Sequence, residues 1–224
     1  MGSMISFEGN GKTCQGYLAP AASGKGPGVI VLQEWWGLVP HIKDVADRFA
    51  AEGFTALAPD LYEGKTADGP DEAGRMMAAL NIAETEKVLR GAADTLASHE
   101  ACASEKIGVI GFCMGGQLAM LAGALNPKVG AVANYYGIHP AVNVDFTRLG
   151  GPVLGIFAET DEFVNAEAVA GLEAQLKKAG KTMTTHLYKG VGHAFFNDTR
   201  PDVYDAGAAK DAWAKTLAFF RSNL

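Results

Sequence analysis

The sequence predicts an α/β fold in which a mostly parallel, twisted sheet carries helices on both faces. Short β-rich runs alternate with helical patterns along the chain, as in sheets built from successive strand–helix–strand units. Runs such as Val29-Ile30-Val31-Leu32 are apolar throughout, which is typical of strands covered on both faces. No internal repeat, low-complexity tract or long linker divides the chain. We therefore expect a single domain over residues 4–224.

Seven runs are predicted to be strands by their β-branched, aromatic and apolar content. They cover residues 16–19, 28–33, 54–58, 107–111, 131–135, 153–158 and 184–188. The first one or two are expected to form an antiparallel edge of the sheet. Ligands of open α/β sheets bind beyond the carboxyl ends of the strands, so the loops after these runs are the place to look for a site.

Helical spacing of apolar residues predicts helices between the strands. Within residues 40–52 the apolar residues recur at this spacing, and Gly53 marks the end. Further helices are expected over 117–125, from an Asn165 cap to Lys178, and over 203–221. The polar, glycine-rich region 64–74 is predicted to be a surface loop.

Composition and charge argue against several classes of protein. A hydrophobic content of 48% with 20% charged residues is typical of a soluble globular chain. The net charge of −6, without a basic run, argues against nucleic-acid binding. No apolar stretch approaches membrane-spanning length and no signal-peptide pattern begins the chain, so we expect no membrane partner and a cytoplasmic location. Met1-Gly2-Ser3, before Met4, reads as a cloning scar.

The three cysteines Cys14, Cys102 and Cys113 are an odd number at unrelated spacings. Neither a disulfide framework nor a zinc site is predicted from them. A reducing cytoplasm suits this set, because one of the three, Cys113, has to remain a free thiol for the chemistry described next.

The segment Gly111-Phe112-Cys113-Met114-Gly115-Gly116 predicts a nucleophile elbow. It follows the apolar run 107–110 and leads into the helical run 117–125, which is the strand, sharp turn and helix of that motif. Glycines are expected on both sides because so tight a turn leaves no room for larger side chains. The helix N-terminus favours the thiolate. We therefore predict that Cys113 is a nucleophile, with a structural cysteine as the alternative.

Two further residues have the types and the order that a cysteine nucleophile needs. His193 lies in the glycine-rich loop after the last strand, and imidazole accepts and returns protons near neutral pH. Asp161 follows the run 153–158 and is the candidate to fix the tautomer of His193, with Glu159 and Glu162 as rivals. The order nucleophile, acid, histidine is that of α/β-hydrolases. Amides of Met114 and near Glu34-Trp35 are candidates for an oxyanion hole.

Glu34 is a carboxylate at the end of an apolar strand, where partial burial is expected. One interpretation is an ion pair with a nearby arginine. The other is a base that helps to ionise Cys113, because a desolvated carboxylate has a raised pKa. The neighbouring pair Trp35-Trp36 fits the core and a pocket lining equally well.

Three motifs together resemble the dienelactone hydrolase family over residues 16–220: 33–38 (QEWWGL), the elbow 111–116 and 192–195 (GHAF). The resemblance implies a carboxymethylenebutenolidase-type α/β-hydrolase that opens cyclic enol-lactones in aromatic catabolism through a Cys-His-Asp triad. Cys113 would attack the lactone carbonyl, with His193 as base and acid and Asp161 orienting it. Glu34 would take the thiol proton when substrate arrives. The oxyanion would be held by the amides of Trp35 and Met114.

The sequence departs from the family where the substrate carboxylate is held. Well-studied members use two arginines, one of them four residues after the histidine, and Asn197 stands at that position here. Arg75 is the candidate for the other arginine, and Arg200 is the candidate to compensate for the arginine missing at position 197. Trp36 is the candidate for lining the pocket. We expect a small lactone or ester as partner, a monomer, and no metal or organic cofactor. The alternatives are a broad-specificity carboxylesterase of the same fold and a noncatalytic thiol sensor or binding protein.

Overall fold

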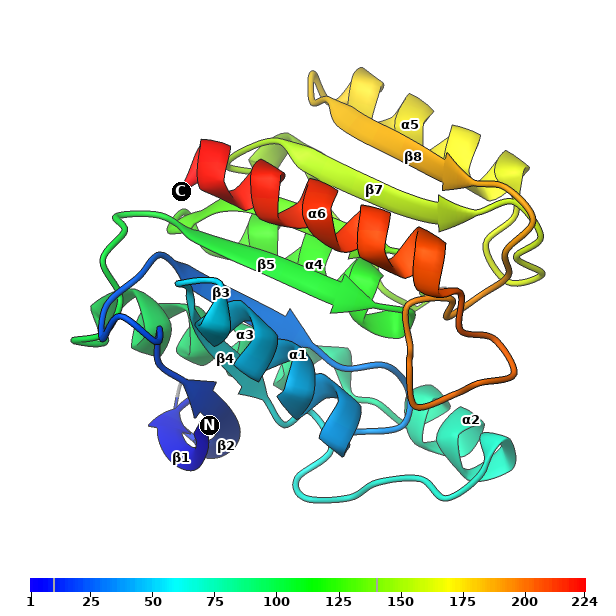
Figure 1. Cartoon of the computed structure of the whole chain (residues 1–224). Coiled ribbons are helices and arrows are strands. Elements are labelled where there is room, and N and C mark those ends of the chain that lie inside the picture. The colour runs from blue at the N-terminus through cyan, green and yellow to red at the C-terminus, as the bar shows by residue number, and fades with distance from the viewer. Residues whose placement is uncertain (10, 140) are drawn as a thin grey trace.

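The computed structural model describes residues 1–9, 11–139 and 141–224. They form one eight-stranded sheet in the order β1-β2-β4-β3-β5-β6-β7-β8 (Figure 1). The strands are β1 (Ser3–Glu8), β2 (Thr13–Ala19), β3 (Gly28–Leu32), β4 (Thr55–Pro59), β5 (Ile107–Phe112), β6 (Val129–Tyr135), β7 (Val153–Ala158) and β8 (Met183–Tyr188). β1 and β2 pair antiparallel, whereas the pairs from β4 to β8 are parallel, so the predicted sheet with an antiparallel edge is confirmed.

Helices cover both faces of the sheet, as predicted. They are α1 (Pro40–Ala51), α2 (Pro70–Ala78), α3 (Ile82–Ser98), α4 (Met114–Leu125), α5 (Ala166–Lys178), α6 (Ala206–Asn223) and the short 3₁₀ helix η1 (Phe146–Arg148). Figure 1 shows α1 and α6 in front of the sheet, with α3, α4 and α5 behind it. The chain therefore forms a three-layer arrangement with its sheet in the middle.

The continuous apolar run in β3 is explained by these two layers. Val29 and Val31 belong to the core under α1 and α6, whereas Ile30 and Leu32 belong to the core under α3, α4 and α5. All five residues of β3 are buried. Successive side chains of a strand point to opposite faces, so a strand with a core on each side needs apolar residues at every position.

Several boundaries differ from those predicted. Region 64–74 is not a loop throughout, because α2 begins at Pro70, where proline in the first turn and the acidic Asp71 and Glu72 favour a helix start. The last helix begins at Ala206 rather than at residue 203, since the Asp205 carboxylate caps it. The sequence patterns predict neither β1 nor α3.

The N-terminus takes part in the sheet. Ser3, which the sequence indicates to be part of a cloning scar, pairs with Leu18 in β1, and the Gly2 amide donates to Asp47 Oδ1 at 2.8 Å. Within the described ranges, no helix combines the length and the apolar character needed to cross a bilayer.

The elbow after β5 is closely packed, as expected from its glycines. A Cβ added at Gly115 would lie 2.4 Å from the Gln33 carbonyl oxygen, and one added at Gly111 would lie 1.9 Å from the Gly115 carbonyl oxygen. Both distances are well below any real carbon–oxygen contact. Only hydrogen fits at these positions, so the helix α4 can approach β3 and β5 closely enough to form the turn.

Gly115→Ala should therefore destabilise the protein by roughly 1–3 kcal/mol or more, because backbone atoms have to move. Gly171 in α5 is the matched control, since a Cβ there would meet no described atom within 4 Å. Gly171→Ala should raise the free energy of unfolding by about 0.5–1 kcal/mol. Urea denaturation measures both variants. Similar changes in the two would contradict close packing at the elbow.

Candidate active site

Four predicted site residues lie in loops at the carboxyl edge of the sheet. Glu34 follows β3, Cys113 follows β5, Asp161 follows β7 and His193 follows β8. These strands are parallel in the sheet, so their carboxyl ends point the same way and the four loops share one edge. The sheet topology thus brings together residues that are up to 159 positions apart (from 34 to 193).

Cys113 sits at the sharp turn between β5 and α4. Its backbone has φ 54° and ψ −123°, outside the regions that most residues adopt. Two hydrogen bonds hold the turn: the Cys113 amide donates to the Tyr135 carbonyl at 3.0 Å, and the Cys113 carbonyl accepts from the Gly116 amide at 2.9 Å. The side chain is half-buried. Met114 opens α4, so its N–H has no acceptor inside the helix and is available to a bound oxygen.

His193 and Asp161 form a direct pair. His193 Nδ1 lies 2.7 Å from Asp161 Oδ2. The other carboxylate oxygen, Oδ1, accepts the amides of Phe163 at 2.8 Å and Val164 at 2.9 Å. These three bonds fix the orientation of the Asp161 carboxylate and, through it, the imidazole ring of His193.

The two partners shift each other's pKa. Burial alone works to raise the pKa of Asp161, but the hydrogen bonds from His193 and from two backbone amides outweigh it and lower that pKa. Burial likewise works to lower the pKa of His193. Its hydrogen bond to Asp161 and its interaction with the Cys113 side chain outweigh this and raise the pKa of His193 to about 10. The raised pKa favours the protonated, imidazolium form of His193 at neutral pH.

The rival carboxylates of Asp161 lie in other environments. Glu159 accepts the Gly190 amide at 3.0 Å, and Glu162 is exposed. Neither forms a hydrogen bond with His193 in the described parts of the chain. The geometry therefore selects Asp161 as the partner of His193.

Glu34 is buried, with 1% of its surface exposed, and Asn197 is its hydrogen-bond partner. Asn197 Nδ2 donates to Glu34 Oε2 at 2.7 Å. Asn197 Oδ1 in turn accepts the amide of Thr199 at 3.1 Å and its hydroxyl at 2.7 Å, which fixes the orientation of the amide group. The partner is neutral, so the interpretation of Glu34 as half of an arginine ion pair is wrong for the described residues.

Burial without a cationic partner raises the pKa of Glu34 above its ordinary value of 4.5. The hydrogen bond from Asn197 and the charges of His193 and Arg200 reduce this rise but do not cancel it. A carboxylate held in this way accepts a proton more readily than an exposed one.

The loop that carries Asn197 is fastened to α1. Asp198 Oδ1 lies 3.2 Å from Nδ1 of His41, and Asp198 Oδ2 accepts from Arg48 Nη2 at 2.7 Å. His41 is buried between the rings of Phe112 and Phe196, so its role is structural. These contacts keep Asn197 against Glu34.

The two tryptophans after β3 contact each other, and one of the two candidate arginines contacts them. Trp35 and Trp36 are both half-buried and meet edge to face, with ring centroids 5.2 Å apart. The Arg200 guanidinium lies over the Trp36 ring, 5.6 Å from its centroid, and also pairs with Asp202. Arg75 is exposed on α2 and has no side-chain hydrogen bond or ion pair to another described residue. Arg200 is thus the arginine that contacts a predicted site residue and acts on the charge of Glu34.

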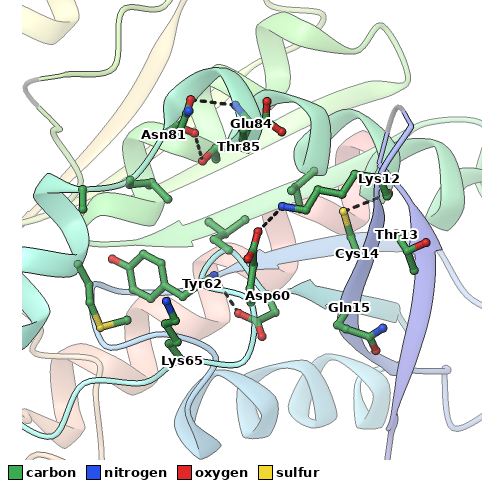
Figure 2. A pocket seen from close by; sticks show the side chains of 16 residues that line it. Lys12, Thr13, Cys14, Gln15, Asp60, Tyr62, Lys65, Asn81, Glu84 and Thr85 are labelled. Carbon is green, nitrogen blue, oxygen red and sulfur yellow. Dashed lines mark hydrogen bonds and ion pairs between the residues drawn. The ribbon is translucent and has the colours of Figure 1, made fainter.

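A separate cavity of about 510 Å³ lies beside the site, between β2, the loop after β4 and the helices α2 and α3 (Figure 2). Its lining includes Lys12, Cys14, Tyr62 and Asn81, but none of the four residues at the carboxyl edge. Tyr62 connects the two regions, because its hydroxyl donates to Met114 Sδ at 3.3 Å. Cys14 therefore belongs to this cavity and not to the predicted site.

Two aromatic residues that were not predicted as site residues lie beside the His193 ring. The rings of Tyr136 and Phe163 lie 5.0 and 5.1 Å from the His193 ring, centroid to centroid. Phe163 is 73% exposed and forms part of the rim. Tyr136 is fully buried and directly follows β6. Its place after a strand is the same signal that identified the other site residues. Among the described residues, no three or more His, Cys, Asp or Glu side chains gather as metal ligands would.

Comparison with known proteins gives a consistent assignment. The sequence model of the Dienelactone hydrolase family matches residues 14–224. "Protein usf" of Aquifex pyrophilus is 42% identical and "Putative carboxymethylenebutenolidase" of Aquifex aeolicus is 37% identical, each over 100% of both chains. The crystal structure of "Putative Dienelactone Hydrolase" from Klebsiella pneumoniae is 28% identical, with a TM-score of 0.86 over 99% of both chains. The chain belongs to the dienelactone hydrolase family and is a hydrolase with the α/β-hydrolase fold.

Proposed function

We propose that the protein hydrolyses small lactones or esters through a thioester formed on Cys113. The arrangement of three side chains supports this above all else. His193 pairs with Asp161 at 2.7 Å, and Cys113, at the strained elbow, is close enough to raise the pKa of His193. Nucleophile, base and orienting acid in this relation are what acyl transfer requires.

The proposed reaction has two halves. The Cys113 thiolate attacks the carbonyl carbon, and the oxyanion is held by the amides of Trp35 and Met114. The carbon–oxygen bond of the ester or lactone then breaks, while His193 gives its proton to the leaving oxygen. In the second half His193 takes a proton from water, the hydroxide attacks the thioester, and the carboxylic acid and the Cys113 thiolate are released. No metal or organic cofactor is needed in this scheme.

Glu34 has a role in forming the thiolate. Its raised pKa makes it a better proton acceptor than an exposed carboxylate, and its neutral partner Asn197 leaves the carboxylate without a compensating positive contact. We propose that Glu34 takes the thiol proton of Cys113 when substrate enters. A fixed Asn197 keeps the carboxylate oriented but does not compete for the proton.

The residue at position 197 also bears on the substrate. An asparagine cannot form the bidentate contact that an arginine makes with a carboxylate. Arg200 is engaged by Asp202 and by the Trp36 ring. We therefore propose uncharged esters and lactones as substrates, with carboxylated lactones such as dienelactone the second candidate. The second candidate is retained because the Arg200 guanidinium, which lies over Trp36, is a cation that a substrate carboxylate can pair with.

A noncatalytic thiol protein is the alternative from another class. Such a protein needs a reactive cysteine but has no use for an aspartate that orients a histidine. The three hydrogen bonds that fix Asp161 therefore favour the hydrolase.

Cys113→Ala should abolish hydrolysis of p-nitrophenyl acetate, because the attacking atom is gone. Cys14→Ala and Cys102→Ala are the matched controls and should retain kcat/KM within about twofold. Cys14 lines the separate cavity, and Cys102 lies beside Gly28 at the start of β3, away from the carboxyl edge. Release of p-nitrophenol measures all three. Activity near the wild-type level in Cys113→Ala would contradict the mechanism. Hydrolysis of cis-dienelactone, followed by the loss of its own ultraviolet absorbance, ranks the substrates, and kcat/KM should be higher for the neutral ester.

Glu34→Gln should raise stability and lower activity. Below pH 4.5 the carboxyl is protonated in both the folded and the unfolded chain. As pH rises, the unfolded chain ionises first, so the raised pKa of Glu34 reduces wild-type stability toward neutral pH. The variant lacks this loss, so its Tm should exceed that of the wild type by roughly 2–4 °C at pH 7 and by less at pH 4.

The activity of the Glu34→Gln variant tests the catalytic role of Glu34 separately from its effect on stability. If it accepts the thiol proton, kcat/KM should fall by about 100-fold or more. Calorimetry at several pH values and an esterase assay provide the two measurements. Wild-type kcat/KM in a folded Glu34→Gln protein would show that Glu34 is not the base.

A further inference from the structure

Tyr136 lies in a turn that is locked against the nucleophile elbow. The Cys113 amide donates to the carbonyl of Tyr135, and the Asn134 side chain exchanges two hydrogen bonds of 2.9 Å with the backbone of Gly137. A Cβ added at Gly137 would lie 2.4 Å from the Cys113 carbonyl oxygen. The turn after β6 and the elbow after β5 are therefore in direct contact, with Tyr136 at the centre of the turn.

The backbone of Tyr136 is strained. Its φ of 40° lies in the left-handed region that bulky side chains rarely adopt, and its amide donates to the Ile156 carbonyl at 2.7 Å. Residues in such conformations cluster at active sites, where the strain directs a side chain. Here the strain places the ring 5.0 Å from the His193 ring and 5.7 Å from the Phe195 ring, centroid to centroid.

The Tyr136 hydroxyl is buried and has no hydrogen-bond partner among the described residues. Burial, followed by the negative charges of Glu34 and Cys113, raises its pKa well above 10, so it remains a hydrogen-bond donor. Buried donors are nearly always paired, and an unpaired one in a native structure calls for an explanation. The adjacent Tyr135 shows the ordinary case, because its hydroxyl lies 2.7 Å from Thr216 Oγ1.

We propose that the Tyr136 hydroxyl binds substrate: it donates a hydrogen bond to an oxygen of the ester or lactone when the acyl group lies beside the Cys113 sulfur. The inference rests on the proposed function, since it requires Cys113 to be the residue that is acylated. Cys113 and His193 are half-buried, whereas Tyr136 is closed off from solvent, so the substrate reaches the hydroxyl from within the site. The substrate then supplies the acceptor that the described residues do not, which favours the bound state.

Tyr136→Phe removes only the hydroxyl and should give two opposite changes. Tm should stay the same or rise, because an unpaired buried polar group is lost. At the same time kcat/KM for p-nitrophenyl acetate should fall by about 100-fold or more, the scale for loss of one oxyanion-hole donor. Tyr135→Phe is the matched control and should show the reverse: a lower Tm, since a paired hydroxyl is lost, and kcat/KM within about twofold of wild type.

A third measurement separates substrate binding from an effect on the thiol. The rate of Cys113 alkylation by iodoacetamide, followed against pH without substrate, should be the same in Tyr136→Phe and wild type. A shifted alkylation profile, an unchanged kcat/KM, or a Tm loss as large as that of Tyr135→Phe would each overturn the proposal. Wild type and Cys113→Ala are assayed alongside. If wild type itself fails to hydrolyse esters, the proposed function has failed, and not the assignment of Tyr136 alone.

Discussion

The strained backbone at Cys113 is the constraint on which the site depends. A φ of 54° at a non-glycine residue is sustained because three neighbouring segments hold it: the glycines of the elbow, the Gln33 carbonyl behind Gly115, and the Tyr135 carbonyl that accepts the Cys113 amide. These contacts set the sulfur at the carboxyl edge and present the first turn of α4 to a bound oxygen. The turn after β6, which contacts the elbow, is also strained, since φ of Tyr136 is 40°.

A second feature is that the buried carboxylate of Glu34 is balanced by an amide rather than by a cation. Asn197 is itself fixed by Thr199, and its loop is fastened to α1 through Asp198. Such a carboxylate costs stability but remains a proton acceptor. The protein therefore keeps two unfavourable buried groups in its resting state, the Glu34 carboxylate and the Tyr136 hydroxyl. Both lie where a substrate on Cys113 would meet them, which is where stability is commonly given up for function.

Local patterns in the sequence were enough to predict the strands from β2 to β8, the elbow and the loops that carry Asp161 and His193, because each of these features depends on neighbours in the chain. Long-range pairings were not predictable in this way. Asn197 and Glu34 are 163 residues apart, and only the folded sheet shows that they share a hydrogen bond. The choice of Asp161 over Glu159 likewise depended on side-chain directions. The glycines of region 64–74 predict a loop throughout, whereas α2 begins within this region, at Pro70.

The central claim, a covalent acyl-enzyme on Cys113, is tested most directly by mass spectrometry. The protein would be mixed with an activated acetyl ester, quenched in acid within milliseconds and digested, and its peptides would be analysed for acetyl groups. The account predicts a transient acetyl group on the peptide that contains Cys113, which disappears at longer times as the thioester is hydrolysed. A protein that turns over the ester without ever carrying the acyl group, or that carries it on another residue, would contradict the account.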